Sequence, residues 1–349
     1  MKLKLSAWVL TLLLLMTVCL SGCSNQANTS ANASSSKSKS NGTVTLTIGA
    51  YSVVPSSLKA IFPLFQKQWK QKTGQTVKFE TSYKGSGSET ESIIQGFPAD
   101  IAILSLEGHI EKLVKAGLIT HNWKSEPHNG MITKSVVALG VRKGNPKNIQ
   151  DWKDLTKKGV KVLFPNPQTS GGAQWDINAI YGAGLKMSGG NKQKTKQLLG
   201  NVYQNVVSLD KSGAASVSTF ESGVGDVIVT YENTLIAANH SGKSYGIILP
   251  KDTISIENPV AVVDKNVEKH GNRKVAEAFV KFLWSKQAQK IFSKNGFRSV
   301  DPSVAKQFAN QYKTPKGLFG IDYLGGWPKV EKTLYSDNGI WNQVVNENQ

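Results

Sequence analysis

Predicted strands and helices alternate along most of this chain, and this alternation limits the folds that it can adopt. Residues 44–48 alternate apolar and polar side chains as a strand does, and apolar side chains then recur at helical spacing from Leu58 to Trp69. Further along, a strand at 226–230 leads into a helix at 232–240. We therefore expect an α/β fold with largely parallel sheets, in which ligands bind at the carboxyl ends of strands.

The composition changes near residue 43. Residues 24–42 are nearly all Ser, Asn, Ala, Lys and Thr, and a segment without large apolar side chains cannot bury enough surface to fold. We interpret 23–42 as a disordered tether. The mixed sequence that follows runs for roughly 300 residues, which is more than one typical hydrophobic core contains, so we expect two lobes.

The N-terminus carries an export signal. Two lysines precede an apolar run over residues 8–20, which ends in Leu-Ser-Gly-Cys at Cys23, and this pattern is typical of a secretory signal peptide. Its end resembles the lipobox of bacterial lipoproteins. That resemblance implies removal of residues 1–22 and a diacylglyceryl group on the Cys23 sulfur. An uncleaved anchor helix is the alternative, and both place the protein on the outer face of the membrane.

Charge and cysteine content exclude several function classes. The formal net charge is +18, but the lysines are scattered and no nucleic-acid reader motif accompanies them. We expect a solvated basic surface near anionic wall polymer and lipid, and no nucleic-acid partner. Of the two cysteines, Cys19 would leave with the signal and Cys23 would be lipidated, so neither a disulfide nor a zinc-cysteine site is expected.

A short loop at the end of a predicted strand suits an anion. The segment PNPQTSGGAQW, Pro165 to Trp175, follows the apolar residues 160–164 and leads into a helix. A helix start exposes free backbone N–H groups, and glycines let a ligand approach them closely. The loop contains no lysine or arginine, so neutral donors alone would hold the anion, which suits reversible capture. A plain strand-turn-helix connection is the alternative.

Similar donor-rich loops follow other predicted strands. They comprise residues 50–52, 84–88 and 212–214, in addition to 170–172. We expect them to meet in one cleft, since parallel strands end at the same edge of a sheet. Gly85-Ser86-Gly87 lacks the third glycine of a dinucleotide fingerprint, and the sequence has no GxxxxGK[ST] phosphate loop.

Several segments of the sequence are distinctive when they are taken together. They are FQKQWKQKTGQT (65–76), GSG (85–87), ADI (99–101), VRKGNPKNIQDW (141–152), PNPQTSGGAQW (165–175), GDV (225–227), YEN (231–233) and GGW (325–327). These segments resemble the bacterial sulfate-binding proteins, the receptors of sulfate and thiosulfate ABC transporters, and they cover nearly the whole mature domain in the family's order. The resemblance implies a two-lobed periplasmic binding protein fold of type 2 topology, with a ligand cleft between the lobes and a monomeric state.

The resemblance also implies the ligand contacts. Sulfate would lie between the lobes, held by neutral hydrogen bonds without metal or cofactor. Ser86 and Ser170 would donate their hydroxyl groups, whereas the other contacts would come mainly from backbone N–H groups. The residues at the family's ligand-binding positions are Ser52, Ser86, Ser170, Gly171, Gly172, Gly213 and Tyr231.

Three positions depart from the family pattern. Ser52 replaces an aspartate, Tyr231 replaces a tryptophan, and Gln174 replaces a common arginine beside the site. A serine hydroxyl and a phenol can accept as well as donate, whereas an indole only donates. A pocket of donors alone rejects a protonated oxyanion, because its proton would lack an acceptor, at a cost of about 1–3 kcal/mol. We predict sulfate as the first ligand, with thiosulfate or another tetrahedral oxyanion such as phosphate or molybdate as the alternative.

Family comparison suggests the lobe boundaries. The first lobe would comprise residues 43–134 plus 257–349, including the C-terminal helices, and the second would comprise 135–256. Hinge strands would lie at 135–141 and 256–263. The implied function is that of an extracytoplasmic, lipid-anchored receptor, which captures sulfate and delivers it to the permease subunits of an ABC importer.

Two rival classes fit the sequence less well. A hydrolase is disfavoured, since the sequence contains no HExxH and no histidine lies near Ser170 in the sequence. A surface adhesin would present exposed aromatic side chains, whereas the tryptophans here occupy helical or motif positions. We therefore predict a binding protein and not an enzyme.

Overall fold

The computed structural model describes residues 42–348. The expected signal peptide over 1–22, the lipidated Cys23 and the tether up to residue 41 lie outside the described residues. Among the helices of the described part, none combines the length and the apolar character that a membrane crossing requires.

The described chain begins with three parallel strands, which we call the first strand group. β1 (Thr43–Tyr51) lies between β2 (Thr76–Lys84) and β3 (Ile101–Ile103) and is parallel to both. α1 (Pro55–Thr73) connects β1 to β2, and its Pro63 is accommodated within the helix. The side chains that α1 buries recur every three or four residues, as predicted, and include Leu58, Ile61, Phe65 and Trp69.

A second strand group repeats this arrangement. β5 (Val162–Pro165) lies between β6 (Val206–Asp210) and β7 (Val227–Tyr231) and is parallel to both. At least one helix follows each of these strands. These helices are α4 (Gly171–Met187), α5 (Lys192–Tyr203), α6 (Gly213–Glu221) and α7 (Glu232–His240).

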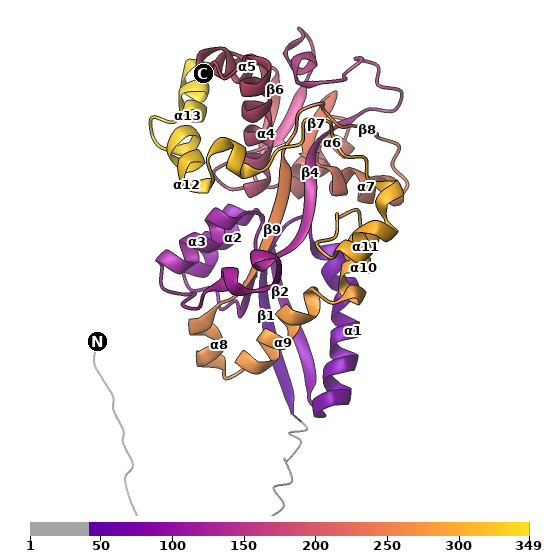
Figure 1. The fold of residues 1–349 in the computed structure, drawn as a ribbon, viewed down its shortest axis with the longest axis vertical. Helices are drawn as coiled ribbons and strands as arrows, with labels where there is room; N and C mark the ends of the chain where they lie inside the picture. The colour runs from indigo at the N-terminus through magenta and orange to yellow at the C-terminus, as the bar shows by residue number, and fades with distance from the viewer. Residues whose placement is uncertain (1–41, 349) are drawn as a thin grey trace, which may run out of the picture. The chain divides into compact units, whose positions relative to one another are not determined.

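Two central strands join the groups into one sheet of nine strands. β4 (Met131–Val141) pairs with β9 (Ser255–Val262), and β4 also pairs with β7 and with β8 (Gly246–Ile248), whereas β9 pairs with β3. All of these pairs are antiparallel. The prediction of largely parallel sheets is therefore right for the two strand groups and wrong for the centre, where both central strands pass from one group to the other (Figure 1).

After β9 the chain returns to the first strand group. α8 (Asp264–His270), α9 (Arg273–Leu283) and α10 (Lys286–Lys294) follow in succession. The ring of Phe279 on α9 lies 5.1 Å from that of Phe65 and 4.9 Å from that of Phe79, measured between centroids. α9 thus covers the same face of the sheet as α1.

The C-terminal segment crosses to the second strand group. After α11 (Pro302–Gln307) the chain reaches α12 (Trp327–Val330) and α13 (Ile340–Glu347), and α13 lies beside α5 (Figure 1). The Trp341 ring of α13 lies 5.4 Å from the Tyr203 ring of α5. The predicted boundaries placed 257–349 with the first lobe, whereas α13 packs on α5. The sequence did not predict this contact, because the helical period of a terminal segment does not identify its packing partner.

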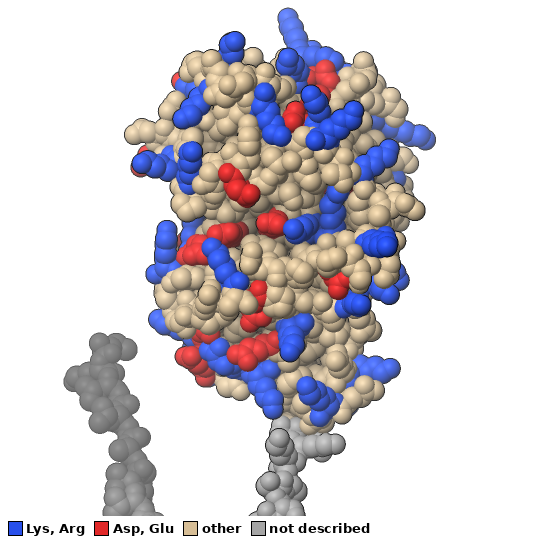
Figure 2. All heavy atoms as spheres, in the orientation of Figure 1, with Lys and Arg blue, Asp and Glu red and all other residues tan. Residues whose placement is uncertain are grey.

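Charged side chains are spread over the surface. Figure 2 shows Lys and Arg scattered over the visible face, with Asp and Glu between them, and no single basic patch. The basic net charge of this chain is therefore distributed on that face as the sequence suggested.

Candidate functional site

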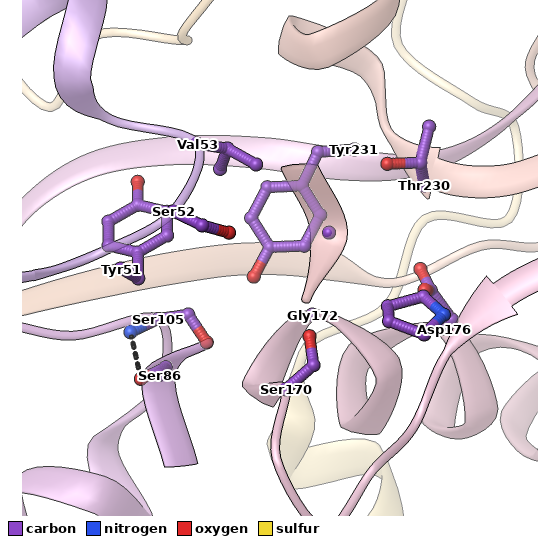
Figure 3. A pocket seen from close by; sticks show the side chains of 12 residues that line it. Tyr51, Ser52, Val53, Ser86, Ser105, Ser170, Gly172, Asp176, Thr230 and Tyr231 are labelled. Atoms are coloured by element: carbon purple, nitrogen blue, oxygen red, sulfur yellow. Dashed lines mark hydrogen bonds between the residues drawn. The ribbon is translucent and has the colours of Figure 1, made fainter. Parts of the chain in front are cut away.

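A small pocket lies where the carboxyl ends of both strand groups meet. The space that the centre of a water molecule can reach in it is about 20 Å³, so it suits a small ion. No lysine or arginine of residues 42–348 lines it. The lining residues, most of which Figure 3 labels, are Tyr51, Ser52, Val53, Ser86, Ser105, Pro165, Ser170, Gly172, Asp176, Gly213, Thr230 and Tyr231.

The pocket brings together most of the residues predicted from the sequence. Six of the seven predicted ligand residues line it, and the seventh, Gly171, stands between Ser170 and Gly172 as the first residue of α4. Figure 3 shows the hydroxyl groups of Ser170 and Tyr231 turned toward the same space. These residues come from five separate loops or strand ends, so only the tertiary fold assembles the pocket.

The start of α4 supplies free backbone donors. Ser170 caps this helix, and its hydroxyl oxygen accepts the Ala173 N–H at 3.4 Å. The N–H groups of Gly171 and Gly172 have no partner within the helix because of their position in its first turn. The first turn of α4 contains no acidic side chain, so its positive dipole end stays uncompensated.

α6 begins at the same pocket. Ser212 caps it by accepting the Ala215 N–H at 3.1 Å, and the Ala214 N–H donates to the Ser52 hydroxyl at 3.3 Å. The Gly213 N–H is left without an intrahelical partner. Because the Ser52 hydroxyl already accepts one bond, its own proton remains available to a ligand.

α2 (Ser86–Ile94) contributes the third helix start. Ser86 is 2% exposed, and its hydroxyl accepts the Ser105 N–H at 2.9 Å and lies 2.8 Å from His109 Nδ1. A Cβ on Gly85 would collide with the backbone carbonyls of Thr169 and Lys211, which belong to the second strand group. Glycine at this position therefore lets the two sides of the pocket approach each other.

Three buried polar atoms around the pocket lack a hydrogen-bond partner within residues 42–348. They are the Tyr231 hydroxyl, the Ser105 hydroxyl oxygen and Oδ1 of Asp176. An unsatisfied buried polar group costs about 1–3 kcal/mol, so a polar ligand that bonds to these atoms would be favoured in this pocket.

Burial also perturbs the acid groups of this pocket. It raises the pKa of the Asp176 carboxyl well above its ordinary value, since the side chain is 1% exposed and no cation contacts it among the described residues. Burial is also the main reason that the pKa of the Tyr231 phenol is raised, and the neighbouring Tyr51 adds to the shift. Both shifts favour the neutral, proton-bearing form, which can donate a hydrogen bond.

The two strand groups contact each other around the pocket. The Trp175 indole N–H donates to the Ser105 carbonyl at 2.7 Å, and the Ser88 N–H donates to the Thr169 carbonyl at 3.2 Å. These bonds join α4 and its loop to the end of β3 and to α2. The structure is therefore that of a closed pocket.

Sequence reasoning missed half of the lining residues. Ser105 directly follows the apolar run 101–104 and could have been found by the rule applied to the other loops. Asp176 lies four residues after Gly172, hence on the same face of α4, which is also readable from the sequence. Tyr51 and Pro165 lie in segments that the sequence singled out, 50–52 and 165–175, but were not assigned as ligand residues. Val53 and Thr230 carry no comparable signal, because only the approach of neighbouring strands brings them to the pocket.

A buried histidine approaches the pocket through Ser86. His109 is 1% exposed, and its Nδ1 lies 2.8 Å from the Ser86 hydroxyl. Burial, with a smaller effect of Lys112, lowers the pKa of His109 to about 3, which makes it a weak general base. Within the described residues no three His, Cys, Asp or Glu side chains are grouped to hold a metal ion.

Gln174 is the third departure from the family pattern. Its side-chain N–H donates to the Pro167 carbonyl at 3.1 Å, so it holds the loop that leads into α4. It therefore acts as a neutral brace beside the pocket.

Comparison with known proteins agrees with the motifs. The family model described as a bacterial extracellular solute-binding protein matches residues 51–298. A sulfate-binding protein of Synechococcus elongatus is 43% identical over 303 residues, 86% of each chain. A sulfate-binding protein of Escherichia coli is 41% identical over 285 residues, 80% of this chain and 86% of the relative. A thiosulfate-binding protein of Pseudomonas aeruginosa is 37% identical over 306 residues, 86% of this chain and 91% of the relative.

A solved structure agrees as well. The sulfate-binding protein SubI of Mycobacterium tuberculosis superposes with a TM-score of 0.79 at 36% identity, covering 84% of this chain and all of that one. The match confirms the predicted periplasmic binding protein fold. The predicted family is confirmed too: the chain belongs to the bacterial extracellular solute-binding proteins, among the sulfate-binding proteins.

Proposed function

We propose that this protein is the extracytoplasmic receptor of an ABC importer and that its ligand is sulfate. The observation that carries this proposal is the pocket itself. Three helix starts and several hydroxyl groups converge on a space for one small ion, and no cationic side chain of the described chain lines it. The relatives named for binding sulfate support the same ligand.

Neutral donors can hold a dianion when enough of them converge. The N–H groups of Gly171, Gly172 and Gly213 and the hydroxyl groups of Ser52 and Ser170 each retain a free proton by the geometry described above. A hydrogen bond to a charged group contributes about 1.5–3 kcal/mol, and several together offset the loss of hydration. Without a fixed counter-ion, release requires only that the cleft open.

Thiosulfate, phosphate or molybdate is the alternative ligand. Tyr231 and Asp176 can accept as well as donate hydrogen bonds, so the rejection of a protonated oxyanion would be weaker than in a pocket of pure donors. Sulfate remains first because the free backbone N–H groups at the starts of α4 and α6 can only donate.

We propose a hinged closure of two lobes, comprising residues 43–134 plus 257–349 and residues 135–256. The hinge would consist of the parts of β4 and β9 near 135–141 and 256–263. α13 is the exception within the first lobe's range, since it packs on α5. Ligand would stabilise the closed form through the contacts that both lobes make to it.

The mature receptor would be a monomer tethered to the outer face of the cell membrane. Its residues 1–22 would be removed, and Cys23 would carry the lipid. The closed form would be presented to the permease subunits, with no role for nucleic acid, cofactor or catalysis.

Isothermal titration of residues 43–349 with sulfate, thiosulfate, phosphate and molybdate at two pH values tests the proposal. We expect one-to-one binding of sulfate, with phosphate bound more weakly. Preferred binding of another of these anions would keep the receptor and change its substrate. No heat and no thermal stabilisation with any of the four would overturn the receptor function.

A further inference from the structure

The Ser86 hydroxyl is a pocket donor whose proton has two possible directions. A serine hydroxyl has one proton and two lone pairs. One lone pair of Ser86 is occupied by the Ser105 N–H at 2.9 Å, because a backbone N–H can only donate. The proton and the other lone pair are shared between His109 Nδ1, which lies 2.8 Å away, and the ligand.

His109 is in its neutral form, which carries a single ring proton. The side chain is 1% exposed, and its pKa is lowered to about 3, chiefly by burial and further by Lys112 of the same helix, α3 (Glu107–Lys115). The proton is then on either Nδ1 or Nε2. The ring also faces the start of α4, since a Cβ on Gly171 would lie 3.1 Å from His109 Cε1.

The position of that single proton decides what Ser86 offers. With the proton on Nδ1, His109 donates to Ser86, both lone pairs of the serine are occupied, and its own proton turns to the ligand. With the proton on Nε2, Ser86 donates to His109 and presents only a lone pair to the ligand. A lone pair repels a fully ionised oxyanion but accepts the proton of a protonated one.

We infer that His109 fixes the direction of the Ser86 hydroxyl proton and thereby determines whether the pocket takes a fully ionised or a protonated oxyanion. This inference rests on the proposed function, and it names one residue that sets the selectivity of the pocket for its anion. For sulfate the bound tautomer is Nδ1–H. His109 does not touch the anion, so it is a positioning residue that acts through Ser86.

Nitrogen NMR of the histidine-labelled mature chain reads the tautomer directly. The sequence has five histidines, and the His109 signals are assigned by their loss in His109→Asn. With saturating sulfate we expect a protonated Nδ1 and an unprotonated Nε2 for His109. A protonated Nε2 in the sulfate complex would overturn the inference while leaving sulfate binding itself intact.

A pair of ligands with the same charge tests the selectivity. At pH 8 phosphate is largely a dianion with one proton, and sulfate is a dianion with none. In His109→Leu the Ser86 hydroxyl can rotate, so we expect the sulfate-to-phosphate affinity ratio to fall about tenfold. In Ser86→Ala, adding His109→Leu should leave the ratio unchanged, because the histidine would then have no hydroxyl to orient.

The outcomes separate the two claims. An unchanged ratio in folded His109→Leu, or an equal fall in the Ser86→Ala background, overturns the role of His109 alone. Absence of sulfate binding by the unchanged protein overturns the proposed function and this inference with it. If His109→Leu fails to fold, as judged by its thermal unfolding, the tautomer measurement decides by itself.

Discussion

Asp176 is an acidic side chain in a pocket that otherwise offers neutral hydrogen-bond donors. Its carboxyl is buried, its Oδ1 has no partner in residues 42–348, and its pKa is raised by burial. A raised folded-state pKa means that the unfolded chain releases this proton at lower pH than the folded one. This group therefore destabilises the fold increasingly as pH rises from the unfolded pKa toward the folded pKa.

The substitution Asp176→Asn tests this pH-dependent loss of folding stability. The amide keeps a donor in the same place without a charge, so we expect a melting temperature higher by a few degrees at pH 8. The gain should shrink as pH falls toward the ordinary range of a carboxyl, near pH 4. Thermal unfolding without ligand at several pH values measures it, and a gain that does not vary with pH would refute the assignment of a neutral Asp176.

At the scale of elements, the start of α4 depends on glycine for a steric reason. A Cβ on Gly171 would collide with the Ser105 hydroxyl and lie 2.9 Å from Leu106 Cδ2. A Cβ on Gly172 would meet its nearest neighbour, the Ser170 hydroxyl, at 3.3 Å. Substitutions at these two adjacent glycines can therefore be compared directly, because only Gly171 contacts residues that follow β3 on the opposite side of the pocket.

We predict that Gly171→Ala lowers sulfate affinity at least about tenfold, whereas Gly172→Ala lowers it much less. The alanine at 171 keeps its N–H but holds α4 away from β3, so the closed form is strained. Titration calorimetry compares the affinities, and unfolding of the ligand-free proteins serves as the control. Equal losses in both variants would contradict the assigned approach of α4 to β3.

Elements with a strong local pattern were readable from the sequence. The helix predicted at 232–240 coincides with α7, and the loops around Ser86 and Ser170 were found because glycines and helix starts are local signals. The antiparallel centre was not readable, since the period of a strand contains no information about its direction. Val53 and Thr230 were not predicted because their place in the pocket is fixed only by neighbouring strands.

At the scale of the whole molecule, the proposed closure of the two lobes would be stabilised by hydrogen bonds between the strand groups. The Trp175 indole N–H to the Ser105 carbonyl, at 2.7 Å, is among the shortest of them. Trp284 makes a comparable bond to the Met131 carbonyl at 2.8 Å, but both partners lie on the first lobe's side of the proposed hinge. Substitution of Trp175 should therefore affect the proposed closure of the lobes, whereas substitution of Trp284 should affect only the stability of the fold.

Trp175→Phe should raise the Kd for sulfate about two- to tenfold, because a net hydrogen bond of about 0.5–1.5 kcal/mol is lost only in the closed form. Trp284→Phe should lower the melting temperature and leave the Kd near its original value. Small-angle X-ray scattering should show sulfate reducing the radius of gyration of the unchanged protein. A Kd that responds equally to both substitutions would speak against a closure made by Trp175.

The chain passes between the two strand groups a third time on its way to α13. Beside β9, the Ser255 N–H donates to the Phe319 carbonyl at 2.8 Å, and the Phe319 N–H donates to the Thr253 carbonyl at 3.0 Å. Three neighbouring chain segments, β4, β9 and the segment around Phe319, now link the two strand groups. Three links resist twisting of one strand group against the other more than two links would, and they favour bending about a single axis. The proposed opening and closing would then follow one coordinate, so a permease would meet few shapes of this receptor.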